Sequence, residues 1–140
     1  MLKDVFGSGI VYGSVRIHNY KWIVFQPDDT AMTPNGHMYW PPDHYLADFS
    51  LSTVTLGKRA WFVHEGAHLY QFYGLGWNVI ARGAVSRNYD YKLDAKKKKL
   101  SDYALEEMGD IAMDYYTLKQ GGTITRPYGL ADYAGLLPLP

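Results

Sequence analysis

The chain has 140 residues, 47% of them hydrophobic, which is the size and apolar content of one domain with its own core and excludes a disordered chain. Its 14 lysines and arginines balance 14 aspartates and glutamates, and this zero net charge argues against a nucleic-acid partner, which would require a clustered basic excess. Cysteine is absent, so disulfides and thiolate metal ligands are excluded.

The sequence shows neither a signal peptide nor a membrane span. Lys3 and Asp4 interrupt the start, and no apolar stretch follows them. The longest uncharged run, residues 66–81, includes histidine, glutamine, asparagine and glycines, and it is too short and too polar to cross a bilayer. We therefore expect a soluble protein that does not insert into a membrane.

Residues 1–50 combine β-branched and aromatic residues with turn formers, which favours short strands. The predicted strands are 11–17, 22–25, 31–33 and 37–40. The last two flank Pro34-Asn35-Gly36, and Asn-Gly is a strong hairpin signal. Either of these two segments could form an edge strand that aligns an extended peptide by strand addition.

A helix is predicted from Ser52 or Thr53 to Tyr73. Either residue can cap the N-terminus, Gly57 can delay the start by a turn, and glycines after Tyr73 end the helix. The helix is apolar on nearly all sides, which is typical of a helix buried in the middle of its domain.

A second helix is predicted from Ser101 to Gln120, where glycines follow. The preceding residues 82–100 are polar and are expected to be irregular, with the basic run 96–99 in solvent. The prediction is thus one α+β domain, 1–140, with a strand-and-turn half (1–50), a helical half (52–120) and a loop-rich tail (121–140) that either wraps the body or hangs free.

The first predicted helix contains His64-Glu65-Gly66-Ala67-His68, an H-E-x-x-H motif. Its histidines lie one turn apart on one face, so both imidazoles can converge on one ion. Zinc suits this geometry, because it binds neutral imidazole nitrogen and with three protein ligands keeps a fourth position for water. Glu65 can take a proton from that water as a general base.

Burial strengthens the metal hypothesis. Histidine and glutamate are unfavourable on a buried helix unless they are liganded or hydrogen-bonded. Gly66 within the motif destabilises a helix by about 1 kcal/mol relative to alanine. This glycine therefore predicts a close approach, either of a ligand or of a packed neighbour.

The third ligand is left open by the motif. Gln71 and Gly74 stand where a metzincin has glycine and histidine, so that subclass is excluded. Glu106 and Glu107 on the second helix are both candidates, as in a gluzincin. Asp110 lies four residues after Glu106 on the same face, where it can accept the outer N–H of a ligating histidine.

Other polar residues are weaker candidates. His18, His37 and His44 could in principle supply nitrogen, but they lie in the strand-rich half and are expected to be surface or hydrogen-bonded residues. Tyr128, Tyr133 and His37 could stabilise an oxyanion, and each is expected to be structural instead.

Four segments resemble the zinc metallopeptidase domains found at the C-termini of VgrG spike and Rhs-type proteins of type VI secretion. These segments are 6–19, 25–36, 61–68 and 102–116, so the resemblance extends over residues 5–120. Many peptidase families share H-E-x-x-H, whereas the Gln-Pro-Asp-Asp-Thr-Ala-Met-Thr-Pro-Asn-Gly segment at 26–36 is much narrower in its distribution.

The resemblance implies a zincin-like fold in which an active-site helix and a second helix pack on a small twisted sheet. It implies a gluzincin-like peptidase with His64, His68 and Glu106 as Zn²⁺ ligands and Glu65 as the base. It also implies an antibacterial effector with a peptide or protein substrate, an immunity protein, and a carrier chain that type VI secretion delivers into the periplasm or cytoplasm of a target cell.

The choice between the two glutamates rests on three arguments. Helical periodicity alone slightly favours Glu107, which lies nearer the main apolar face. The spacing to Asp110 favours Glu106, and the resemblance places the ligand directly after Tyr103-Ala104-Leu105. We therefore predict Glu106 as the third ligand.

The alternative function is a non-enzymatic module of a secreted spike protein, stabilised by zinc, that binds a partner. An aromatic content of 16% would then mark an interface. Glu65 and an open coordination position distinguish the two functions, because a structural zinc usually has four protein ligands and needs no base.

Overall fold

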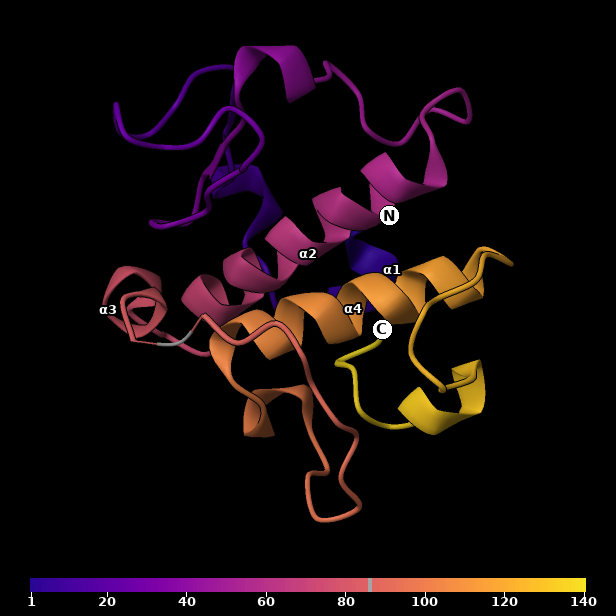
Figure 1. Cartoon of the computed structure of the whole chain (residues 1–140). Coiled ribbons are helices and arrows are strands. Elements are labelled where there is room, and N and C mark those ends of the chain that lie inside the picture. The colour runs from indigo at the N-terminus through magenta and orange to yellow at the C-terminus, as the bar shows by residue number, and fades with distance from the viewer. Residues whose placement is uncertain (86) are drawn as a thin grey trace.

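The computed structural model describes residues 1–85 and 87–140. Two long helices, α2 (Leu56–Tyr73) and α4 (Leu105–Lys119), lie side by side in the centre of the molecule (Figure 1). The residues before α2 lie mainly on its side of this pair, and the connection into α4 and the C-terminal tail lie on the side of α4 (Figure 1).

The remaining elements are short. They are α1 (Lys3–Phe6), α3 (Val79–Gly83), strands β1 (Ile17–His18) and β2 (Met38–Tyr39), and 3₁₀ helices at Tyr12–Ser14, Pro42–His44, Leu100–Asp102 and Leu130–Tyr133. The fold is thus mainly helical with a small two-stranded sheet, which agrees with the α+β prediction at that level. Within the described ranges, no helix is long and apolar enough to cross a membrane.

The sheet differs from the predicted strands. Within 11–17, only the last residue enters β1, which pairs with β2 in parallel and places Ile17 opposite Met38. Segment 22–25 forms no strand, and Val24 and Phe25 are 88% and 90% exposed. Their β-branched and aromatic character favours a strand only where the side chains pack on a pleated surface, and here they face solvent.

The predicted hairpin around Pro34-Asn35-Gly36 is reduced to one antiparallel bridge between Met32 and Tyr39. The amide of Met32 donates to the carbonyl of Tyr39 at 3.0 Å, and the amide of Tyr39 donates back at 2.8 Å. Because β2 also pairs with β1, the segment at 37–39 lies inside this small sheet and is not an edge strand.

The helix with the motif is capped two to three residues later than Ser52 or Thr53, within the delay that Gly57 allows. Thr55 is the N-cap, and its side chain accepts a hydrogen bond from the amide of Lys58 at 3.3 Å. The predicted burial is confirmed, since all residues from Phe62 to Leu69 are buried.

α4 also begins later than predicted, and Ser101 lies in a preceding 3₁₀ helix. The Glu107 carboxylate accepts the amide N–H of Ala104 at 2.9 Å and so caps the helix. In the polar segment 82–100, α3 ends at Gly83 and a 3₁₀ helix begins at Leu100. The described residues between these two helices are irregular, as predicted. Position 86 lies outside the described residues.

The C-terminal tail wraps the body. Tyr133, Leu136 and Leu137 are buried in the core, and the amide of Leu100 donates to the carbonyl of Leu136 at 2.9 Å. The tail therefore forms part of the surroundings of α4.

Gly66 serves the packing of α1 on α2. A Cβ atom at this position would lie 2.5 Å from Cδ2 of Leu2 and 3.0 Å from the ring of Phe6. The sequence predicts that either a ligand or a packed neighbour lies close to Gly66, and the structure shows the packed neighbour.

Candidate metal centre

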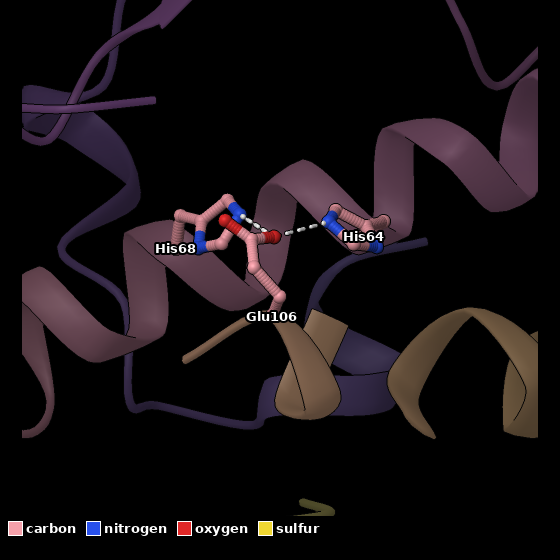
Figure 2. A group of neighbouring side chains, drawn as sticks. All are labelled: His64, His68 and Glu106. Atoms are coloured by element: carbon pink, nitrogen blue, oxygen red, sulfur yellow. Dashed lines mark hydrogen bonds and ion pairs between the residues drawn. The ribbon is translucent and has the colours of Figure 1, made fainter. Parts of the chain in front are cut away.

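Three side chains from α2 and α4 meet between the helices. His64 and His68 project from α2, and Glu106 projects from the first turn of α4 to lie between them (Figure 2). Oε2 of Glu106 is 3.2 Å from Nε2 of His64 and 3.3 Å from Nε2 of His68. Ligand atoms from all three residues lie within 4.8 Å of one another, so this group can hold a metal ion.

The outer nitrogens of both histidines are engaged. Nδ1 of His64 is 3.0 Å from Oδ1 of Asp110, and Nδ1 of His68 is 2.8 Å from Oε1 of Gln71. These oxygens can only accept, which assigns the proton to Nδ1 in each ring and directs Nε2 towards the centre of the group. Two imidazole nitrogens and a carboxylate, oriented in this way, fit a divalent transition-metal ion.

Gln71, whose identity excludes a metzincin, also links His68 to α4 in the structure. Its side chain is fully buried, and its amide nitrogen donates to the carbonyl of Leu105 at 2.7 Å. Gln71 thereby ties His68 to the start of α4, beside Glu106. Its spacing of three residues from His68, on one helical face, is the sequence signal for this contact.

Electrostatics bind the three groups together. Burial lowers the pKa of His64, but hydrogen bonds to Asp110 and Glu106 outweigh it and raise that pKa to about 10. Burial raises the pKa of Glu106, but hydrogen bonds with His64 and His68 outweigh it and lower that pKa to about 2. A cation bound here would displace protons from the Nε2 atoms and take over the attraction to the carboxylate.

Glu65 lies beside this group. Its side chain is buried, and Oε2 accepts a hydrogen bond from the hydroxyl of Thr33 at 2.6 Å. Its negative charge contributes to the raised pKa of both His64 and His68. Thr33 follows the bridge at Met32, so the small sheet touches the motif at this carboxylate.

The two candidate glutamates on α4 lie in different places. Glu106 contacts both histidines, whereas Glu107 caps the helix and lies 3.8 Å from Nζ of Lys97. Asp110 contacts His64, as its spacing from Glu106 suggested. The structure thus brings His64, His68, Glu106 and Asp110 together and leaves Glu107 outside.

The other candidate histidines and tyrosines have different partners. His37 accepts the amide N–H of Arg16, and His18 stacks on Tyr39. His44 lies 3.0 Å from Nζ of Lys58. The hydroxyl of Tyr128 accepts the amide N–H of Leu93, and that of Tyr133 bonds to Tyr91 in the core. None of the five belongs to the metal-binding group found among the described residues.

Tyr89 is a neighbour of His64 that no motif in the sequence indicates. Its ring stacks against His64 with centroids 6.1 Å apart and planes inclined by 26°. Partial burial, with the negative charges of Glu106, Glu65 and Asp110, raises the pKa of this half-exposed phenol. The residue lies in the polar connection before α4, where sequence offers no periodicity that could relate it to the motif.

Gly109 is the position on α4 that admits the imidazole of His64. A Cβ atom there would lie 2.5 Å from Cε1 and 2.7 Å from both ring nitrogens of His64. We expect Gly109→Ala to displace the ring and to reduce the affinity of this group for a divalent metal ion by roughly 10–100-fold, the range for lost support of a metal ligand. Competition with a chromophoric chelator measures this affinity.

Gly57→Ala is the matched control for Gly109→Ala, because a Cβ at Gly57 meets nothing within 4 Å. This variant should have the same affinity for a divalent metal ion as the parent protein. Equal metal affinity in the two alanine variants would contradict the steric role of Gly109.

Comparisons with known proteins agree with this arrangement of helices. No model of a known protein family matches the chain. The type VI secretion system spike protein VgrG2b of Pseudomonas aeruginosa is 35% identical over 128 residues, which cover 85% of this chain and 12% of that much longer protein. The solved effector domain of Pseudomonas aeruginosa VgrG2b matches with a TM-score of 0.77 and 32% identity over 96% of this chain and 77% of that domain. The chain therefore belongs to the family of VgrG2b-type effector domains of type VI secretion spike proteins.

Proposed function

We propose that this chain is a zinc-dependent metallopeptidase of zincin-like fold, with residues 1–140 forming one catalytic domain. The observation that carries the proposal is the convergence of His64, His68 and Glu106 on one point, with both histidines oriented through their outer nitrogens. Two imidazoles and one carboxylate are a ligand set that leaves zinc a position for water or substrate.

Zinc bound at this point supplies a Lewis acid, which polarises a peptide carbonyl and lowers the pKa of water towards about 7. Glu65 accepts the proton of the attacking water and later donates it to the leaving amine. Thr33 engages Oε2 of this carboxylate, so we assign the proton transfer to Oε1. Burial of Glu65 keeps bulk water away from the transfer.

We assign substrate alignment to segment 31–33. Met32 uses its amide and carbonyl on Tyr39. In an extended strand the neighbouring backbone groups alternate to the other side, and we propose that an extended peptide adds there. Thr33 also contacts Glu65, and a peptide added there would lie next to the proposed base.

The biological part of the proposal follows from the family. The matched relative is a spike protein, and we propose that a VgrG or Rhs-type carrier delivers this domain by type VI secretion into a competing bacterial cell, as an antibacterial toxin. A protein or peptide of the target is then the substrate, and an immunity protein protects the producing cell.

Metal content and proteolysis test the enzymatic function directly. The purified chain should contain one zinc ion per molecule and should cleave an unfolded protein substrate. A chelator should stop the cleavage and added zinc should restore it. His68→Ala serves as the matched control that neither binds zinc tightly nor cleaves. Stoichiometric zinc without cleavage would contradict the peptidase and would support the zinc-stabilised binding module.

A further inference from the structure

One arginine of the C-terminal tail holds two carboxylates of α4. Nη2 of Arg126 donates to Oδ2 of Asp110 at 2.9 Å, and Nη1 donates to Oδ2 of Asp114 at 2.8 Å. The two aspartates are one helical turn apart, and their side chains are only 11% and 8% exposed. Charge-assisted hydrogen bonds in such a setting are strong, and the planar guanidinium reaches both carboxylates from one position.

Asp110 is therefore held at both of its oxygens. Oδ1 faces Nδ1 of His64 at 3.0 Å, while Oδ2 accepts from Arg126. Rotation of this carboxylate would break at least one of the two bonds. The guanidinium thus determines where the acceptor behind His64 lies.

The same guanidinium nitrogen also holds the backbone of a residue whose ring stacks on the imidazole of His64. Nη2 of Arg126 donates to the carbonyl of Tyr89 at 2.9 Å, and the ring of Tyr89 stacks against His64. This bond ties the irregular segment before α4 to the tail. It keeps the Tyr89 backbone at the distance that the stacking requires.

Arg126 is itself held in place. Its guanidinium lies 4.3 Å from the ring centroid of Tyr91, and the hydroxyl of Tyr91 donates to Asp114 at 2.7 Å. The arginine thus has an aromatic surface on one face and carboxylates along its edge, which leaves it little freedom to move.

We infer that Arg126 is a positioning residue of the metal centre, which fixes His64 through Asp110 at Nδ1 and through Tyr89 at the ring. The inference rests on the proposed role of His64 as a metal ligand. It assigns the tail, which supplies no ligand, a direct part in the geometry of the site.

Zinc affinity of the full chain tests this role, measured by competition with a chromophoric chelator alongside the absorption spectrum of the cobalt-substituted protein. Arg126→Gln should lower zinc affinity by roughly 10-fold or more, as for other supports of ligating histidines, and should alter the cobalt spectrum. Arg126→Lys should lower zinc affinity nearly as much as Arg126→Gln, because one ammonium cannot bridge both aspartates and the Tyr89 carbonyl. Arg82→Gln is the matched control, since Arg82 stacks on Trp77 and should leave affinity unchanged.

A double variant with Asp110→Asn distinguishes a positioning role of Arg126 from a general effect on the stability of the protein. In Asp110→Asn the charged link to Arg126 is already weakened, so adding Arg126→Gln should reduce affinity by a smaller factor than in the parent. If both Arg126 variants lower the melting temperature of the metal-free protein but bind zinc with parental affinity, the inference is overturned and the arginine is only structural. Absence of zinc binding in the parent protein would overturn the proposed function and this inference together.

Discussion

Glu65→Gln is expected to retain one zinc ion per chain and to lose peptide hydrolysis, with kcat lower by about 100- to 10,000-fold. Glutamine preserves the size of the side chain and an oxygen that can accept from Thr33, but it cannot take a proton from water. Turnover of a fluorogenic peptide and zinc content in the same preparations measure the two effects.

Glu107→Gln is the matched control for Glu65→Gln, because it makes the same carboxylate-to-amide change on a residue that caps α4. A glutamine can still accept the N–H of Ala104, so rate and zinc content should stay at parental values. Hydrolysis at the parental rate by Glu65→Gln would refute Glu65 as the base and leave the metal centre intact.

Removal of Glu106 should differ from Glu65→Gln, because the bound metal should be lost together with the activity. Glu106→Ala deletes the oxygen that lies between both Nε2 atoms, and we expect zinc affinity to fall by more than about 100-fold, beyond the loss typical of residues that only support a ligand. Zinc stoichiometry after exhaustive buffer exchange measures this loss.

The neighbouring variant Glu107→Ala should keep its zinc and lose stability. It removes the carboxylate that accepts the N-cap amide, which reduces the free energy of unfolding by about 0.3–1.5 kcal/mol. Thermal unfolding of the zinc-loaded protein measures that effect. Zinc loss in Glu107→Ala with retention in Glu106→Ala would move the ligand by one residue without overturning the zincin proposal.

The motif was the part of the site that sequence could place. Helical spacing puts His64 and His68 on one face, and the apolar surroundings of the motif predict its burial, which the structure shows. The N-cap of α2 is two to three residues later than predicted, because Ser52, Thr53 and Thr55 are all good N-caps and their local preferences do not distinguish them.

The ambiguity between Glu106 and Glu107 had a specific cause. Ser101 is a far better N-cap than Ala104, so the sequence predicts a start four residues too early and places both glutamates beyond the first turn. With the start at Leu105, Glu107 occupies the third helical position, where a carboxylate reaches back to the N-cap amide. The correct boundary would have identified Glu107 as the cap and left Glu106 for the histidines.

The remaining contacts of the site depend on tertiary packing. Thr33 and Glu65 are 32 positions apart, and Arg126 reaches Tyr89 across 37. Such pairs follow from how loops cross the two helices, and no local pattern in a single sequence encodes them. The short strands are similar, because β1 and β2 pair two residues each and their register comes from the surrounding packing.

The separation of the proposed ligands along the chain would link metal supply to the survival of the protein. His64 and Glu106 are 42 positions apart and meet only when α2 packs on α4, so an unfolded chain offers an ion little more than the two histidines of the motif. By mass action, zinc bound as proposed would favour the folded state by about 2.7 kcal/mol when its free concentration is 100 times the Kd. The free zinc of the compartment would accordingly set two quantities at once, the fraction of molecules able to cleave and their lifetime against degradation.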